Sequence, residues 1–278
     1  MNLLLLEPDL RLARALAASI GDRGQVFDLS RWDEALALAT EGKLHAVFGE
    51  AAYLPDMAQL RAQGVPCALW TARSVDDLVL AARSASVSVL VSKTHPVLFE
   101  ELLLAAECWI HGIRPGVGKY LSPGCTSLGE LSVSDAEEVG DACRTILATL
   151  GADMRCNRRL RLVLDELMTN SLHHGGGVPA KVEWASDGVR HVFVVRDAAG
   201  KLEPDEALRL LDRHLHGEGL QDPRGRGLHL SRIYADRLYV SVVPGQMTES
   251  AAIFWNRPGT FQGFKPIWVL STDRTKED

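Results

Sequence analysis

The sequence lacks the features that mark membrane-bound and secreted proteins. None of its apolar runs approaches the roughly 18–20 residues of a membrane-spanning helix. The apolar start at 1–6 has no basic region before it, unlike a secretory leader. The five cysteines are odd in number, widely spaced and form no C-x-x-C pair, which argues against a disulfide framework or a zinc site. We therefore expect a soluble protein of the reducing cytoplasm.

An excess of positive charge is also missing. Lys and Arg number 30 against 36 Asp and Glu, which gives a net charge of −6 and a pI of about 5.9. Such a chain has no overall attraction to phosphate backbones or anionic lipids, so we expect neither nucleic acid nor a membrane as a partner. Hydrophobic residues make up 46% of the 278 positions, which is enough for a core, and the length predicts two domains.

Residues 1–111 alternate short apolar runs with amphipathic segments. The expected strands are 3–6, 25–29, 46–48, 66–70 and 87–91, and the expected helices are 10–20, 32–40, 57–63, 75–83 and 96–110. Continuous apolar runs are typical of strands that are covered on both faces. Five β-α repeats in this length therefore predict an α/β domain, with a five-stranded parallel sheet and helices on both sides.

The pattern breaks between 112 and 134. Glycines and prolines crowd this segment without sustained periodicity, namely Pro115, Gly116, Gly118, Pro123, Gly124 and Gly129. A composition of this kind predicts a linker.

Residues 135–278 have the pattern of an α+β domain. The expected helices are 135–150, with Ser134 as its N-cap, 157–174 and 228–235, and the expected strands are 180–185, 189–196, 238–243 and 251–255. The strands fall into two hairpins, because short turn sequences separate their members. This order predicts helices on one face of a mainly antiparallel sheet.

The expected helix at 157–174 carries one polar stripe. At about 100° per residue, Glu166, Asn170, His173 and His174 project from the same side of it. A carboxylate one turn from a carboxamide suits a hard cation such as Mg²⁺, and the carboxylate can also hold or deprotonate a hydroxyl or a water. A solvated polar face of a helix would show the same stripe.

Two further features follow along the chain. Asp197 ends an expected strand, where an acceptor-only carboxylate suits an exocyclic amine such as that of adenine. The motif Arg224-Gly225-Arg226-Gly227 stands immediately before a helix, where free N–H groups and the helix dipole attract anions. Each feature alone is weak evidence. Together with the polar stripe, and in this order, they predict a nucleotide site.

In these residues the sequence resembles the GHKL ATPase superfamily, and within it the anti-sigma-factor serine kinases. The resemblance covers about 135–256 and implies the Bergerat fold, an α+β ATP-binding sandwich, with ATP and Mg²⁺ as cofactors. It implies that Glu166 is the catalytic base or holds Mg²⁺ or its water, and that Asn170 is the Mg²⁺ ligand. Asp197 would contact adenine. The other implied nucleotide-binding residues are His174, Gly200, Gly225, Arg226 and Gly227.

The second family motif is altered in this chain. It reads D-x-G-x-G in the family, whereas this chain has Asp197-Ala198-Ala199-Gly200-Lys201. One added methyl group where the backbone approaches the base would cost about 1–3 kcal/mol, which is about ten- to a hundredfold in affinity. We therefore expect weakened ATP binding, and a binding-only domain stays open as an alternative.

Residues 1–111 resemble a two-component receiver, which is a flavodoxin-like domain. The positions that match or stand near the receiver's phosphorylation site are Glu7, Asp9, Glu50, Thr71 and Lys93. Glu50 takes the place of the phosphoacceptor aspartate, and Pro8 interrupts the acidic cluster. We therefore expect a degenerate receiver that does not accept phosphate, in which Glu50 pairs with Lys93 and holds one fixed state. A surface glutamate at a strand end is the simpler alternative.

The two resemblances together imply a cytoplasmic signalling regulator. Kinases of this type transfer a phosphoryl group from ATP to a serine or threonine of a small antagonist protein and can hold a sigma factor, so that partners switch with phosphorylation. A second copy of the chain is a further implied partner. A sensor histidine kinase would need two long dimerisation helices with a phosphoacceptor His, and the helix at 135–150 contains no His. A catalytically inactive nucleotide- or protein-binding scaffold also fits the altered motif.

Overall fold

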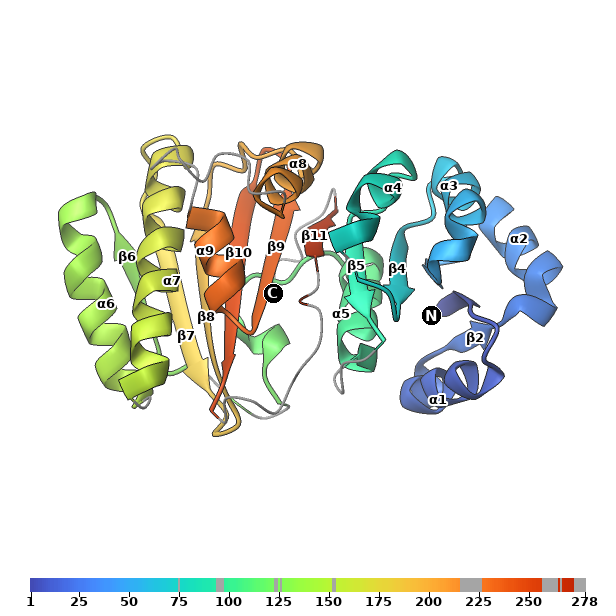
Figure 1. Cartoon of the computed structure of the whole chain (residues 1–278), viewed down its shortest axis with the longest axis horizontal. Helices are drawn as coiled ribbons and strands as arrows, with labels where there is room; N and C mark the ends of the chain where they lie inside the picture. Colours follow the sequence, from blue (N-terminus) through green and yellow to red (C-terminus); the bar gives the residue numbers. More distant parts are fainter. Residues whose placement is uncertain are drawn as a thin grey trace. The chain divides into compact units, whose positions relative to one another are not determined.

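The structure, a computed structural model, describes residues 1–74, 76–93, 98–122, 125, 127–151, 154–215, 227–256, 265 and 267–272. The chain forms two compact units (Figure 1). The first unit is Met1–Gly112 with Ile267 and Trp268, and the second takes in 113–256 and 269–272. No helix in the described ranges is long and apolar enough to cross a membrane.

The first unit is built on a parallel sheet. Its strands are β1 (Asn2–Leu6), β2 (Gln25–Phe27), β3 (Ala46–Gly49), β4 (Cys67–Thr71) and β5 (Val89–Ser92). They lie in the order β2-β1-β3-β4-β5, and every pairing between neighbours in this order is parallel. The apolar run at Leu3–Leu6 is fully buried, as expected for a strand covered on both faces.

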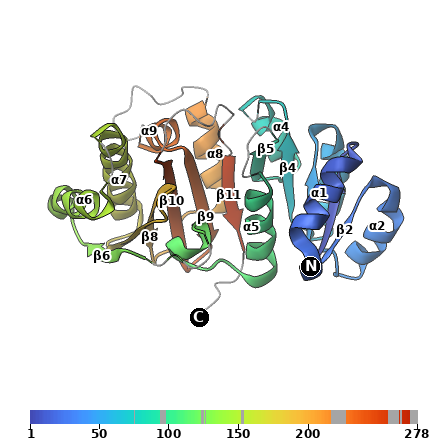
Figure 2. The ribbon, with the colours of Figure 1, turned by 90° about the horizontal axis from the view of Figure 1, so that it is seen from below.

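Five helices cover this sheet. They are α1 (Leu10–Ile20), α2 (Trp32–Thr40), α3 (Leu54–Ala62), α4 (Val79–Ser84) and α5 (Leu98–His111). The helices α1 and α5 contact each other on one side of the sheet, and α4 lies on the other side (Figure 2). The helices α3 and α4 begin at other residues than the sequence predicted, and the predicted start of α5 at 96 lies outside the described residues. Pro55 lies in the first turn of α3, where a fixed φ favours a helix start, and a short 3-10 turn at Asp76–Leu78 precedes α4.

A sixth strand, β11 (Ile267–Ser271), was not expected from the sequence. Ile267 and Trp268 pair with Leu90 and Val89 of β5 in the antiparallel direction, so the sheet of the first unit is mixed at this edge. The remaining residues of β11 belong to the second unit, where 269–271 pair in the parallel direction with β9.

The second unit is built on an antiparallel sheet. Its strands are β6 (Gly129–Val133), β7 (Ala180–Ser186), β8 (Arg190–Asp197), β9 (Arg237–Val243) and β10 (Met247–Trp255), in the order β9-β10-β8-β7-β6. The helices are α6 (Ala136–Leu150), α7 (Met154–His174), α8 (Pro204–Leu215) and α9 (Gly227–Tyr234). They lie on one face of this sheet (Figure 1). Side chains of α6 and α7 form one core with Trp184, Phe193 and Phe254 from that face.

The segment predicted as a linker contains regular structure. A 3-10 turn runs over Val117–Tyr120, and β6 pairs with β7 from Gly129 to Val133. The strand has only two apolar residues to bury, Leu131 and Val133, and this short alternation is hidden by the surrounding glycines. The next helix also begins one residue later than predicted. Asp135, rather than Ser134, is the N-cap of α6, because its Oδ1 accepts from the N–H groups of Glu137 and Glu138.

Candidate functional site

One helix carries both the core and a row of polar side chains. Leu160, Leu164 and Leu167 of α7 are buried in the core of the second unit, while Glu166 and Asn170 are half-buried beside it. These two side chains lie against the first residue of α9. A Cβ atom on Gly227 would lie 2.5 Å from Oε2 of Glu166 and 2.9 Å from Nδ2 of Asn170. A side chain at position 227 would therefore displace the Glu166 carboxylate and the Asn170 amide, and the start of α9 lies against the polar row of α7.

Asp197 lies at the end of β8 and is buried. Its Oδ1 accepts hydrogen bonds from the N–H groups of Ala199 and Gly200, each at 3.1 Å. Gly175, just after α7, packs so closely on Asp197 that a Cβ atom there would approach the aspartate Cβ to 3.1 Å. Thr248 of β10 is the direct cross-strand neighbour of Asp197. The end of α7 and the ends of two strands thus meet at this carboxylate.

A cavity of about 340 Å³ connects these features. Its walls come from α7, β8, the turn after β8, α8, α9, β9 and β10. The lining residues include the predicted Asn170, His174, Asp197 and Gly227, among apolar side chains such as Leu167, Val195, Leu228 and Val240. A concave, largely apolar site with a few convergent polar groups is typical of a small-molecule site.

Two buried hydroxyl groups on the cavity wall have no hydrogen-bond partner among the described residues. They are Oγ of Ser171 and Oγ1 of Thr248. Buried polar groups are normally paired, so an unpaired one next to a cavity indicates a place where a ligand or water completes the bond. The sequence reasoning missed Thr248, because it began the strand at 251. The signal was present in the alternation of hydroxyl side chains at Thr248 and Ser250.

The other predicted residues of this site are distributed differently. Glu166 does not line the cavity itself, although its carboxylate lies against Gly227, which does. Gly200 lies in the turn after Asp197, with a φ of 54°, and its α-carbon packs against the backbone of Gln246. Gly225 and Arg226 are outside the described residues.

The altered motif is accommodated by the turn after β8. Among the described residues, Ser86 is the only non-glycine residue with a positive φ, so neither Ala199 nor Lys201 has a strained backbone. The left-handed position is occupied by Gly200 instead. Ala199 does not line the cavity, whereas Lys201 does. The replacement that faces the cavity is therefore the lysine.

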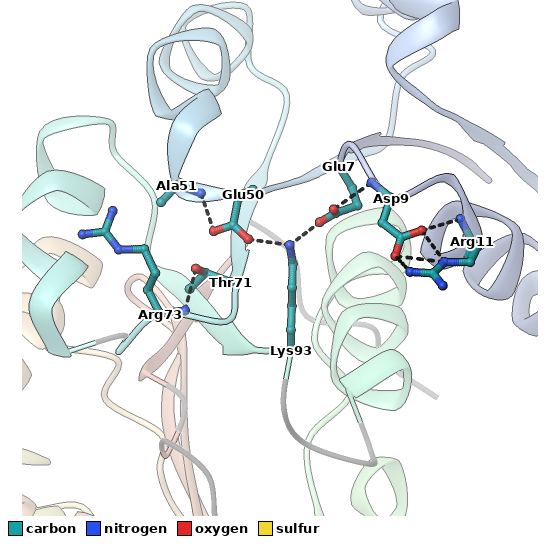
Figure 3. Close-up of polar contacts among 8 residues, drawn as sticks. All are labelled: Glu7, Asp9, Arg11, Glu50, Ala51, Thr71, Arg73 and Lys93. Atoms are coloured by element: carbon teal, nitrogen blue, oxygen red, sulfur yellow. Dashed lines mark hydrogen bonds and ion pairs between the residues drawn. The ribbon is translucent and has the colours of Figure 1, made fainter.

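The first unit contains a second polar cluster, where β1, β3 and β5 end (Figure 3). The ammonium group of Lys93 contacts both the Glu7 and the Glu50 carboxylates. Burial by itself raises the pKa of Glu50, but hydrogen bonds from Lys93, from Thr71 and from the Ala51 N–H outweigh it, so the pKa lies below its usual value. Glu50 thus stays ionised and paired.

Asp9 does not join this cluster. Its carboxylate forms a two-pronged pair with the Arg11 guanidinium, with contacts of 2.7–3.2 Å, and caps α1 through the Arg11 N–H at 2.9 Å. The hydrogen bonds to Arg11 lower the pKa of Asp9 to about 2. The structure therefore brings together Glu7, Glu50, Thr71 and Lys93 and turns Asp9 away (Figure 3). Across the described parts of the chain, no three or more His, Cys, Asp or Glu side chains are arranged to hold a metal ion.

Residues 131–249 match the family model of the histidine kinase-like ATPase domain. The match begins in β6 and ends in β10, so it includes Glu166, Asn170, Asp197 and Gly227. It implies that this region binds ATP. No curated protein matches the chain.

Two solved structures show weaker similarity. The response regulator DrrB of Thermotoga maritima, an OmpR/PhoB homolog, is 18% identical with a TM-score of 0.31 over 39% of this chain and 52% of that chain. The chain thus spans about half the length of that regulator. The SiaB–SiaC complex from Pseudomonas aeruginosa is 17% identical with a TM-score of 0.33 over 46% of this chain and 89% of that chain. Similarities of this size establish neither a shared fold nor a shared function.

Proposed function

We propose that the chain is a signalling regulator whose second unit is an ATP-dependent protein kinase. Its substrate would be a serine or threonine of a small antagonist protein. A sigma factor is the further partner that this type of kinase implies, and phosphorylation of the antagonist would switch the kinase between the two. The observation that carries the proposal is the cavity that Asn170, Asp197 and Gly227 line together, in the region that matches a histidine kinase-like ATPase domain.

The deep end of the cavity suits a purine base. Both hydrogen bonds of Asp197 to its own turn use Oδ1, which leaves Oδ2 to accept from an exocyclic amine. The Thr248 and Ser171 hydroxyls supply further groups that can donate or accept at the edge of a base. Apolar side chains such as Val195 and Val240 offer flat surfaces for the ring. These groups together favour adenine.

The end of the cavity at α9 suits the phosphates. The first N–H groups of a helix attract anions, and Gly227 and Leu228 at the start of α9 line the cavity. Asn170 would offer Mg²⁺ a neutral oxygen, and Glu166 would orient or deprotonate the hydroxyl of the substrate. Bound Mg²⁺ would neutralise charge on the phosphoryl group during its transfer. We assign Gly225 and Arg226 to the same phosphates, by resemblance.

The first unit would not take up phosphate. The oxygens of Glu50 are engaged by Lys93 and by the Ala51 N–H, and Glu7 is engaged by the same lysine. Both carboxylates are thus already paired, and Glu50 stands where a receiver has its phosphoacceptor aspartate. We therefore propose a receiver-like unit held in one state.

Calorimetry with Mg-ATP tests the proposal. We expect binding by the wild type, loss of binding in Asn170→Ala, and unchanged binding in His173→Ala, because His173 is exposed on the same helix and does not line the cavity. Glu166→Gln should keep ATP binding and lower ATP turnover by about 10²–10⁴-fold. A wild type that binds no ATP would contradict the proposal.

A nucleotide-binding scaffold without catalysis is the second candidate. Lys201 lines the cavity where the family has glycine, and a long cationic side chain at this place could bind the nucleotide in a nonproductive position. ATP binding with no difference in turnover between the wild type and Glu166→Gln would favour this function. A histidine kinase has less support, since α6 lacks a histidine.

A further inference from the structure

Residues 113–122 form a strap across the second face of the sheet in the second unit. This face carries Glu183, Tyr239 and Glu249, which alternate along their strands with the residues of the helix-covered core. Val117 of the strap is fully buried there, and the Tyr120 ring stacks on Tyr239 with 5.6 Å between centroids. Figure 2 shows the strap on the opposite side of β9 and β10 from α9. The strap is therefore an integral layer of this unit.

The strap converges on one buried carboxylate. Glu249 of β10 is 0% exposed. Its Oε2 accepts from the Gly116 N–H at 2.7 Å, and its Oε1 pairs with the Lys119 ammonium and lies 3.4 Å from the Tyr120 hydroxyl. Arg196 of β8 approaches Oε2 to 3.8 Å. Gly116 has a φ of 96° and lies against Glu183, so only glycine fits at this point of the strap.

This ion cluster lies directly behind the base end of the cavity. In the pairing of β8 with β10, Glu249 is opposite Arg196, and the next pair along is Thr248 with Asp197. Neighbouring residues on a strand point to opposite faces. The Thr248 and Asp197 side chains therefore face the cavity, while those of Glu249 and Arg196 face the strap.

We infer that Lys119 and Glu249 are positioning residues for the base end of the nucleotide site. The inference rests on the proposed ATP binding of this cavity. By neutralising Glu249 within the sheet, the Lys119 ammonium holds β8 and β10 in the register that places Asp197 and Thr248 side by side. Loss of the ammonium leaves a buried carboxylate without its closest cation, and the strands then shift or admit water to solvate it. The loss of Lys119 therefore weakens the binding of the base more than the binding of the phosphates.

The test compares two diphosphates that differ at the base. ADP has an exocyclic amine for Asp197, whereas inosine diphosphate has a carbonyl oxygen at that position. Calorimetry with the full chain measures the Kd of each. Lys119→Met should raise the Kd of ADP about tenfold and change the Kd of inosine diphosphate less than about twofold. A loss of base discrimination is a readout that general destabilisation does not produce.

Arg190→Met is the matched control. Arg190 forms a partly buried pair with Asp187 at 2.9 Å, at the turn between β7 and β8 and away from the cavity, and the strap residue Ser122 also contacts Asp187. We expect this variant to lose stability in urea comparably to Lys119→Met and to keep the preference for ADP. Glu249→Gln combined with Lys119→Met should be no worse than Lys119→Met alone, because both changes remove the same interaction.

Three outcomes would overturn the inference. The first is an equal loss of affinity for both diphosphates in Lys119→Met, and the second is no loss for either. The third is the same loss of ADP preference in Arg190→Met. A wild type that binds neither diphosphate would contradict the proposed function itself, and this result is distinct from the other three.

Discussion

The two polar sites of this chain differ in how far their groups are satisfied. In the first unit the Lys93 ammonium joins Glu7 and Glu50, and Arg11 engages Asp9. In the second unit the cavity keeps unpaired hydroxyls at Ser171 and Thr248 among the described residues. A site whose charges are neutralised internally has nothing to offer a ligand, whereas unpaired groups around a cavity do. This contrast is the reason for proposing that the second site binds a ligand and that the first does not.

Removing the lysine from the paired site of the first unit should have the largest effect on stability. Lys93→Met leaves Glu7 and Glu50 close together without a cation, and removal of one partner from a buried pair costs about 3–5 kcal/mol. Because Glu50 is partly exposed, we expect the lower end of this range. The free energy of unfolding of the first unit should fall by about 3 kcal/mol. Urea denaturation measures this loss through tryptophan fluorescence, because Lys93 lies 5.2 Å from the centre of the Trp70 ring.

Lys43→Met is the control for this change. Lys43 pairs with Glu41, but both side chains are largely exposed, and such a pair contributes little to stability. Similar denaturation curves for the two variants would mean that the Lys93 cluster does not stabilise the first unit. If the cluster stands in for a metal site, millimolar Mg²⁺ should restore part of the stability of Lys93→Met and leave the wild type unchanged.

Adding a methyl group at the cavity of the second unit should have the next largest effect, on ATP binding. Gly227→Ala places a methyl group 2.5 Å from the Glu166 carboxylate and 2.9 Å from the Asn170 amide. Overpacking of this kind costs about 1–3 kcal/mol, so we expect the Kd of ATP to rise about 10- to 100-fold. Calorimetry provides the measurement. Gly140→Ala in α6, where a Cβ atom meets nothing within 4 Å, should bind ATP like the wild type.

Removing one unpaired hydroxyl sharpens the comparison. Thr248→Val exchanges the unpaired Oγ1 for a methyl group, which relieves an unsatisfied buried polar atom. We expect ATP affinity to fall by about 1 kcal/mol, while the free energy of unfolding stays equal or rises. Ser241→Ala removes a buried, unpaired hydroxyl from the opposite face of the sheet and should leave ATP binding intact. A fall in both affinity and stability for Thr248→Val would show that the hydroxyl has a structural partner instead.

The smallest expected effect is a change in how the unfolding free energy of the first unit depends on pH. The pKa of Glu50 is lower in the folded unit than its ordinary value of 4.5. The paired carboxylate therefore stabilises the folded state above that value, and this contribution is lost as the pH falls through the lower, folded pKa. Glu50→Gln has no such contribution to lose. As the pH falls below 4.5, the wild type should lose more of its unfolding free energy than Glu50→Gln, and parallel curves would contradict the assignment.

Some of this organisation was readable from the sequence because it is local. The run at Leu3–Leu6 predicts a buried strand without knowledge of its neighbours, and the spacing of Glu166 and Asn170 puts both on one side of a helix. Asp197 was identified by its place at a strand end. The cavity then brought Asn170, Asp197 and Gly227 together, although the sequence alone did not show how closely they approach.

Other features depend on partners far along the chain. Ile267 pairs with Leu90, and no local pattern indicates where a late, short strand will pair. Thr248 and Glu249 read as a polar turn until β10 is placed between β8 and β9. The turn at the altered motif is a similar case, since the sequence did not show that Gly200 takes the left-handed position. These features are set by strand register and backbone angles, which a local sequence pattern does not reveal.

The strap also determines where the chain can be truncated without uncovering the core of the second unit. A fragment beginning at Asp135 would lose β6 and the strap together, which uncovers the Trp184 ring that packs on Gly129 and exposes the Glu249 carboxylate to water within a sheet built to bury it. A fragment that begins at Ile113, directly after the helix α5, keeps both layers. Proteolysis of the native protein should accordingly spare the stretch from Ile113 to Leu121, despite its wealth of glycine and proline.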